Sequence, residues 1–174
     1  MTEPIEFDPV DKIGAGAFGR PGERTFVIQA HKGAAVLSIL VEKEQVALLV
    51  AEAEQFLDRI ADDEPEEAAT TVELEVNGPV TEDEPLFRAR LIGIGYDPDR
   101  RLVLIELREE AVEEGEQPPS FETSEGHIAR LYATRAQVRA MVTHGAASVA
   151  AGRPRCQLCD FPMDPDGHVC PRWN

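Results

Sequence analysis

Apolar side chains recur at steps of three and four residues in two segments of the chain, a spacing that places them on one face of an α-helix. In the first segment, residues 42–61, they are Val46, Leu49, Val50, Ala53, Phe56, Leu57 and Ile60. In the second segment, residues 135–151, they are Val138, Met141, Val142 and Val149. Thr134 is a suitable N-cap for the second helix, and Gly152 and Pro154 end it. Each predicted helix therefore has one apolar face that can cover a sheet.

Outside these helices the pattern changes to short runs of β-branched, aromatic and alternating apolar residues, which are typical of β-strands. Residues 24–31 and 34–41 flank the turn dipeptide Lys32-Gly33 and predict a hairpin. Residues 86–95 and 101–108 predict a second hairpin around a Pro-containing turn. A further strand is predicted over residues 127–133, directly before the second helix.

The remaining segments have a weaker pattern. Residues 5–22 are rich in glycine and predict an irregular edge strand that runs into a loop. Residues 70–76 predict a short strand. The acidic segments 62–69 and 109–126 predict loops or linkers, because they are rich in charge and contain proline.

The order of these elements predicts an α+β fold. Two strand-then-helix units, over about residues 20–62 and 86–151, suggest an internal repeat. We expect the units to pair into one antiparallel sheet with both helices on the same face. The predicted domain covers residues 1–152, and residues 153–174 form a separate small module.

Charge is distributed unevenly along the chain, whose net charge is −16. Residues 1–126 carry 30 acidic and 11 basic side chains, a net charge of −19, whereas residues 127–174 carry six arginines and three acids. A strongly acidic body repels nucleic acid at long range. No apolar run has the length of a membrane span, and the acidic N-terminus does not resemble a signal peptide. These features predict a cytoplasmic protein that does not enter membranes.

The C-terminal module contains all three cysteines of the chain and one of its four histidines. Cys156, Cys159, His168 and Cys170 follow the spacing C-x2-C-x8-H-x-C, which is typical of a tetrahedral Cys3His zinc site. Four protein ligands leave no open position for water or substrate, so we predict one structural Zn²⁺ per chain. Nearby Asp160, Asp164 and Asp166 are expected to cap turns or to orient His168 rather than to bind the metal.

The rest of the sequence predicts no catalytic residue. The run from Gly14 to Gly19 matches GxGxxG, but Pro21 and a strand follow it, so no helix N-terminus could receive a phosphate. We therefore interpret it as a loop. His31, His127 and His144 lack the spacing of a metal or catalytic motif and are expected to be surface or partly buried side chains.

Arg153, Arg155, Arg172 and Trp173 flank the metal motif and are the candidate partner-binding residues. The first hypothesis is a non-enzymatic adaptor or regulator that binds another protein. An alternative is a nucleic-acid-associated zinc knuckle, since basic residues beside an aromatic suit that role. A third is a small enzyme that uses His31 or the Gly14–Gly19 segment. The sequence predicts no oligomeric state.

Several segments together resemble one family. They are the FDP near the N-terminus, Pro21–Phe26, the EKEQV run at 42–46 and the tail from Ala151 to Arg172, including CxLC and DPDGHxCPR. These residues resemble an actinobacterial family of unknown function (number three thousand and ninety). The resemblance covers nearly the whole chain, and the tail is its most specific part. It implies an actinobacterial cytoplasmic protein and brings no activity with it.

Overall fold

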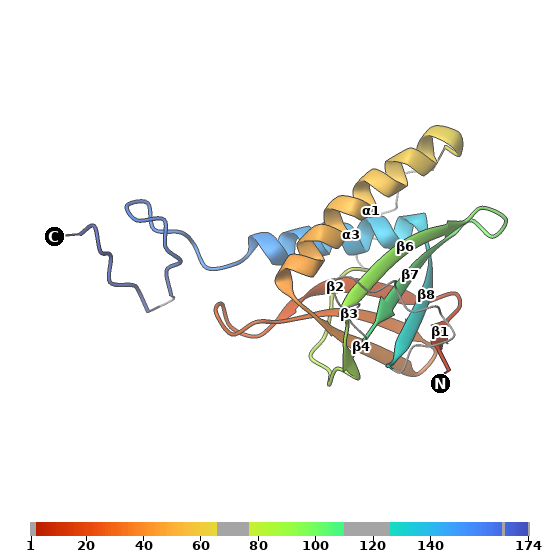
Figure 1. Cartoon of the computed structure of the whole chain (residues 1–174), viewed down its shortest axis with the longest axis horizontal. Helices are drawn as coiled ribbons and strands as arrows, with labels where there is room; N and C mark the ends of the chain where they lie inside the picture. The colour runs from red at the N-terminus through yellow and green to blue at the C-terminus, as the bar shows by residue number, and fades with distance from the viewer. Residues whose placement is uncertain (1–2, 66–76, 110–125, 165, 174) are drawn as a thin grey trace, which may run out of the picture.

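The computed structural model describes residues 3–65, 77–109, 126–164 and 166–173. The named elements in chain order are β1 (Ile5–Phe7), β2 (Lys12–Phe18), β3 (Thr25–Lys32), β4 (Ala35–Val41), α1 (Lys43–Asp63), β5 (Phe87–Arg88), β6 (Leu91–Asp97), β7 (Leu102–Arg108), β8 (Ile128–Thr134) and α3 (Arg135–Ala150) (Figure 1). The predicted strand at 70–76 and most of the predicted acidic loop at 109–126 lie outside the described residues.

The α+β class is confirmed, but the described strands form two mixed sheets instead of one antiparallel sheet. Their orders are β1-β8-β7-β6 and β2-β3-β4-β5. Within each sheet three strands form an antiparallel meander, and the fourth strand pairs in parallel with the last strand of the meander: β1 with β8, and β5 with β4. The sequence pattern predicts strands of the meanders because consecutive strands pair there. It does not predict the parallel pairs, because these join segments that are distant in the sequence.

Each half of the chain donates its first strand to the sheet of the other half. The first half runs β1, then the meander β2-β3-β4, then α1; the second runs β5, then the meander β6-β7-β8, then α3. β1 pairs with the second meander and β5 with the first. The two halves therefore share the same order of strands and helix. The internal repeat suggested by the sequence stays a prediction.

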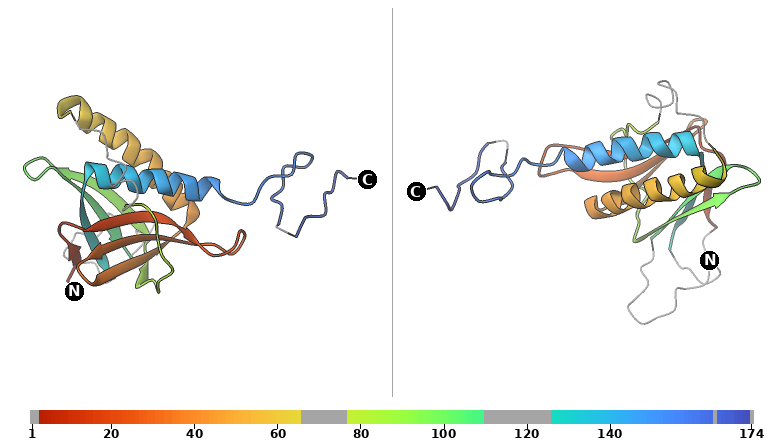
Figure 2. Two further views of the ribbon diagram at one scale, coloured as in Figure 1. Left: turned by 180° about the vertical axis from the view of Figure 1, so that it is seen from behind. Right: turned by 90° about the horizontal axis from the view of Figure 1, so that it is seen from above.

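The two helices lie side by side on the same side of the strands (Figure 2). α3 lies between α1 and β2, and Gly145 marks the closest approach. A Cβ atom built there would lie 3.1 Å from a Val50 methyl of α1 and 3.5 Å from Ala15 of β2. One core joins all these elements, and its fully buried members include Ile28, Ile39, Leu57, Ile105, Leu131 and Met141.

Both predicted helices are present, with boundaries that shift by one or two residues. The predicted N-cap Thr134 accepts a hydrogen bond from the Gln137 N–H at 3.2 Å, and Gln137 completes a capping box. Glu42 and Gln45 form the equivalent capping box at the start of α1. The hairpins over 24–41 and 86–108 are also confirmed in outline.

The glycine-rich segment from Gly14 to Gly19 is mostly strand, and the loop prediction for it is wrong. Its first five residues belong to β2, which pairs with β3 along its whole length. A Cβ at Gly14 would lie 2.6 Å from the Gly78 carbonyl oxygen, so the glycine admits a neighbouring backbone. The Ile13 N–H donates to the Asn77 side chain at 3.1 Å, and Ile13 accepts from the Gly78 N–H at 2.8 Å.

The predicted strand over 86–95 divides into β5 and β6, which belong to different sheets. The side-chain amide of Gln45 donates to the carbonyls of Ala89 and Arg90, at 3.3 and 3.2 Å, where the chain crosses from one sheet to the other. Because this hydrogen bonding comes from α1, the local alternation of residues 86–95 does not reveal the break.

Candidate metal centre

The C-terminal segment extends away from the body beyond the end of α3 (Figures 1 and 2). We call residues 153–173 the knuckle. Its first loop closes around the CxxC pair: the Asp160 N–H donates to the Cys156 carbonyl at 2.9 Å, and the Cys156 N–H donates to the Phe161 carbonyl at 2.9 Å. Asp160 has φ +61°, a left-handed conformation that turns the chain after the second cysteine.

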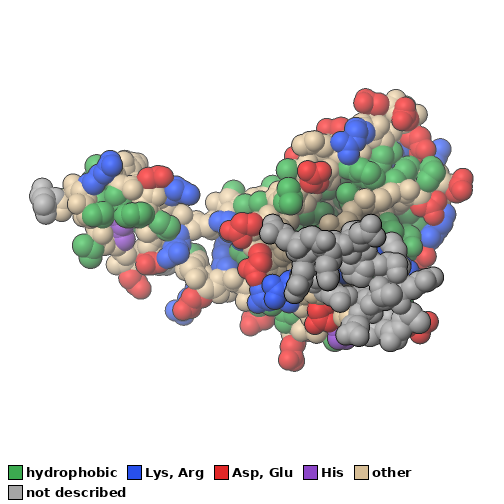
Figure 3. All heavy atoms as spheres, in the orientation of Figure 1, with side chains coloured by type: hydrophobic (Ala, Val, Ile, Leu, Met, Phe, Trp, Pro, Cys, Tyr) green, Lys and Arg blue, Asp and Glu red, His purple; other side chains and the backbone are tan. Residues whose placement is uncertain are grey.

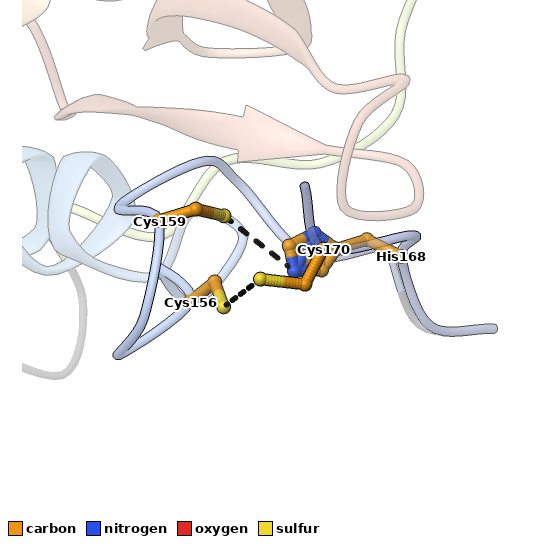
Figure 4. Close-up of side chains that lie close together, drawn as sticks. All are labelled: Cys156, Cys159, His168 and Cys170. Carbon is orange, nitrogen blue, oxygen red and sulfur yellow. Dashed lines mark hydrogen bonds between the residues drawn. The ribbon is translucent and has the colours of Figure 1, made fainter. Parts of the chain in front are cut away.

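The second loop brings the remaining two candidate ligands back to the first. The Met163 N–H donates to the Pro154 carbonyl at 2.8 Å, and the Gly167 N–H donates to the Asp164 carbonyl at 2.9 Å. Gly167 has φ +97°, which favours glycine. The chain then runs through His168 to Cys170, whose side chains point toward the CxxC pair (Figure 4).

The four predicted ligands come together into one cluster. Their ligand atoms all lie within 4.8 Å of one another. The sulfurs of Cys156 and Cys170 are 3.8 Å apart, and the Cys159 sulfur is 3.8 Å from Nε2 of His168 (Figure 4). A tetrahedron with metal–sulfur bonds of about 2.3 Å has sulfur–sulfur edges of roughly 3.8 Å. The cluster could therefore hold a metal ion with little rearrangement.

The sulfur separation also distinguishes this cluster from a disulfide. A disulfide requires about 2.05 Å between sulfurs, well below the separation of Cys156 and Cys170. All three cysteines are free thiols. The thiols of Cys156 and Cys170 belong to buried residues, while Cys159 is half-buried. Three thiols and one imidazole facing one point supply a complete four-donor set, which leaves no vacant position for a substrate.

The backbone around the CxxC pair acts on its thiols in opposite directions. The N–H groups of Cys159 and Leu158 donate to the Cys156 sulfur and hold the pKa of its thiol below the ordinary value. Burial raises the pKa of the Cys159 thiol. N–H groups that point at a sulfur stabilise its thiolate, the form that binds metal. The turn therefore favours the thiolate form of Cys156 relative to that of Cys159.

The predicted partner-binding arginines are tied to acceptors within the knuckle. Arg153 pairs with Asp164 at 2.6 Å and Arg155 with Asp160 at 2.9 Å. Arg172 donates to the Leu158 carbonyl at 3.1 Å. Two of the three aspartates that the sequence assigned to turns therefore stabilise the two loops through these ion pairs.

Apolar side chains are exposed on the knuckle, and sequence reasoning missed most of them. They are Leu158, Phe161, Val169 and Trp173, with exposed fractions of 52%, 58%, 97% and 79%. Val169 is exposed because its two neighbours, His168 and Cys170, both face the cluster, and side chains alternate along an extended chain. Figure 3 shows apolar and basic side chains together on this module. The signal available in the sequence was the placement of Leu158 beside Cys159 and of Val169 between His168 and Cys170.

The other histidines lie far from the knuckle in three different environments. His31, His127 and His144 are half-buried. His127 stacks on Phe87 with ring centroids 5.5 Å apart, and its Nδ1 lies 2.7 Å from a Glu109 carboxylate oxygen. His144 packs over Gly78, where a Cβ would lie 2.0 Å from its ring. The structure does not bring these three together.

A groove of about 420 Å³ lies between α1 and β6. Its walls are mainly apolar and include Leu48, Leu49, Leu91, Ile92 and Ile94. Apolar side chains gather along α1 above the strands in Figure 3. Gln45, Glu52 and Arg90 also line the groove. Neither His31 nor the Gly14–Gly19 segment does, so this hollow is not the site imagined for a small enzyme.

One comparison with known proteins gives a match, and it covers almost the whole chain. A family model described as "Protein of unknown function (DUF3090)" matches residues 5–170, a span that includes the body and all four candidate ligands. Comparison with curated proteins and with solved structures gives no significant match. Within the described part of the chain, neither helix has the length and apolar character needed to cross a bilayer.

Proposed function

We propose that this chain, which belongs to the family described as "Protein of unknown function (DUF3090)", is a non-enzymatic adaptor or regulator that binds another protein through a zinc-stabilised knuckle. The single observation that carries the proposal is the set of exposed apolar side chains around a closed ligand cluster. Such side chains rarely gather on so small a module unless a partner covers them.

Zinc is the ion that best matches the donor set. Thiolate and imidazole donors in a tetrahedral arrangement favour zinc among the common cellular ions. The motif supplies four protein ligands, so the role we assign to the ion is structural: it holds the two loops of the knuckle together. Bound zinc requires reduced thiols, which supports a cytoplasmic location.

A protein partner is better supported than nucleic acid. Phosphate recognition needs basic side chains that are free to donate to the nucleic-acid backbone. Arg155 and Arg172, which lie within the loops of the knuckle, instead donate to Asp160 and to the Leu158 carbonyl. The apolar side chains of Val169 and Trp173 are the ones left to meet a partner, as at the core of protein interfaces.

The test is affinity capture from the native cells with the full chain, comparing wild type with a Val169→Asp, Trp173→Ala variant. The matched control is Leu48→Asp, because Leu48 is 63% exposed on α1 of the body. We expect a protein recovered by wild type and by the control, and lost with the knuckle variant. Zinc content measured on each protein shows that the knuckle stays folded. Recovery of the same proteins by all three would contradict the adaptor role.

A further inference from the structure

A small hollow at the base of the knuckle is lined by three cations from three separate parts of the chain. Its volume is about 200 Å³, and its lining residues are Gly22, Arg24, Phe26, Lys43, Gly152 and Arg153. Arg24 precedes β3, Lys43 begins α1, and Arg153 follows α3. None of the six lining residues is acidic, although the chain as a whole carries a net charge of −16. Three positive side chains in one hollow repel each other unless an anion joins them.

Two of the cations lie directly against glycine backbone. A Cβ built on Gly152 would lie 2.9 Å from the Lys43 ammonium nitrogen. A Cβ built on Gly22 would lie 3.6 Å from Nε of Arg153 and 3.7 Å from its Cζ. A side chain at Gly152 would displace the Lys43 ammonium, whereas a Cβ at Gly22 would make ordinary contact with Arg153. Both charged groups line the same hollow.

The third cation has an unused donor. The Arg24 Nη1 donates to the Ser148 carbonyl at 3.0 Å, which fixes the guanidinium at the C-terminal end of α3. Its Nε is buried and has no hydrogen-bond partner among the described residues. A buried donor without a partner is costly, and this Nε is closed to solvent, so it would meet an oxygen bound in the hollow only after a shift of the Arg24 side chain.

We propose that this hollow binds the phosphate group of a small phosphate monoester. Asp164 neutralises one of the three cations through its ion pair with Arg153, and the remaining charge of +2 matches the charge of about −1.5 to −2 on such a group. Guanidinium groups donate two parallel hydrogen bonds to phosphate oxygens, and an ammonium group adds a point charge.

A neighbouring hollow gives room for the rest of the molecule. It shares Arg24, Phe26 and Lys43 with the first and has a volume of about 490 Å³. Its further lining includes the apolar residues Leu40, Val41 and Pro85. The charged residues Glu42, Glu44 and Arg88 also line it, and Glu42 and Arg88 form an ion pair with each other. The phosphate would thus join the body to the linker that carries the knuckle. This site uses none of the metal ligands and goes beyond the adaptor role.

The experiment measures thermal unfolding of the metal-loaded full chain in inorganic phosphate, phenyl phosphate or acetate, each against potassium chloride at equal ionic strength. At a concentration tenfold above the dissociation constant, we expect either phosphate to raise the Tm by about 4 °C. Phenyl phosphate should act at lower concentration than inorganic phosphate, since it also fills the apolar hollow. A Tm increase no larger than that in chloride, or an equal increase in acetate, overturns the proposal.

Variants separate binding in the hollow from general electrostatics. Lys43→Gln should weaken phosphate binding about tenfold, because it removes one charge-assisted hydrogen bond. Lys12→Gln is the matched control, because it removes the same charge at the end of the β2–β3 pair opposite to Phe18 and Thr25. This variant should bind phosphate with the affinity of the wild type. Gly152→Ala keeps every charge but displaces the Lys43 ammonium and should also weaken binding. Wild-type affinity in Lys43→Gln, or an equal loss in Lys12→Gln, overturns the proposal.

Discussion

Metal removal should unfold the knuckle and leave the body folded. In the knuckle, Cys156 and Cys170 are the only buried residues among those described. Ordering a backbone costs about 1–2 kcal/mol per residue, which two small side chains cannot offset. A bound ion would supply the missing stabilisation, since structural zinc binds such segments with about 10–16 kcal/mol at pH 7, a dissociation constant of roughly 10⁻⁷ to 10⁻¹² M.

The stability of the body should not depend on the metal, because no residue of the knuckle belongs to its hydrophobic core. Among the described residues, the last buried residue of that core is Val142, and the last partly buried residue packed against it is Val149. We expect the Tm of the body to change by less than about 1 °C when a chelator removes the metal. Over the same titration, the three cysteines of the chain should become reactive toward a thiol reagent. Elemental analysis of the untreated protein should give one zinc per chain.

Cys159→Ser should weaken metal affinity by at least about 100-fold, since even the loss of a residue that only orients a ligand costs 10–100-fold. Gln157→Ser is the matched control: Gln157 is an exposed residue within the same CxxC turn, and its replacement should leave the affinity unchanged. Equal protection of the thiols before and after chelation would refute the assignment of the four ligands. A large fall in the Tm of the body would refute its independence from the knuckle.

Two further predictions concern the body. Gly145→Leu should lower the free energy of unfolding, measured in urea titrations, by about 1–3 kcal/mol, because even a Cβ built there would lie 3.1 Å from Val50. Gly93→Ala is the control, since nothing lies within 4 Å of a Cβ built at Gly93. An equal loss of stability in both variants would contradict the packing argument. The His127 N–H and ring lower the pKa of Glu109 below its ordinary value of 4.5, so this contact stabilises the fold above that pH and is lost as the pH falls through the lowered pKa. Glu109→Gln should flatten this part of the stability–pH curve, and an unchanged curve would count against the contact.

The sequence predicted the helices, the hairpins and the clustering of the four candidate ligands because the information for each is local. The apolar faces of α1 and α3 repeat within a few turns, and the four ligands fall within fifteen residues of one another. The family resemblance is likewise confirmed by the match over residues 5–170. The protein partner, the cytoplasmic location and the identity of the ion stay predictions.

Features that depend on distant segments were missed. Gly14 and Gly16 suggested a loop, yet they pair with β3 as part of β2. They are glycines because the backbone at Gly78 and the Ser148 side chain approach them closely. The division of the strand predicted over 86–95 depends on Gln45, more than forty residues earlier. The three cations of the proposed phosphate site, Arg24, Lys43 and Arg153, are likewise far apart in the sequence, so they form no recognisable motif.

The exchange of first strands between the halves has a consequence for protein engineering. A chain cut within residues 66–76 would give two fragments, each with a meander and a helix but with its first strand seated in the other fragment's sheet. Neither fragment expressed alone should then be stable, whereas co-expression should restore the complete core by fragment complementation.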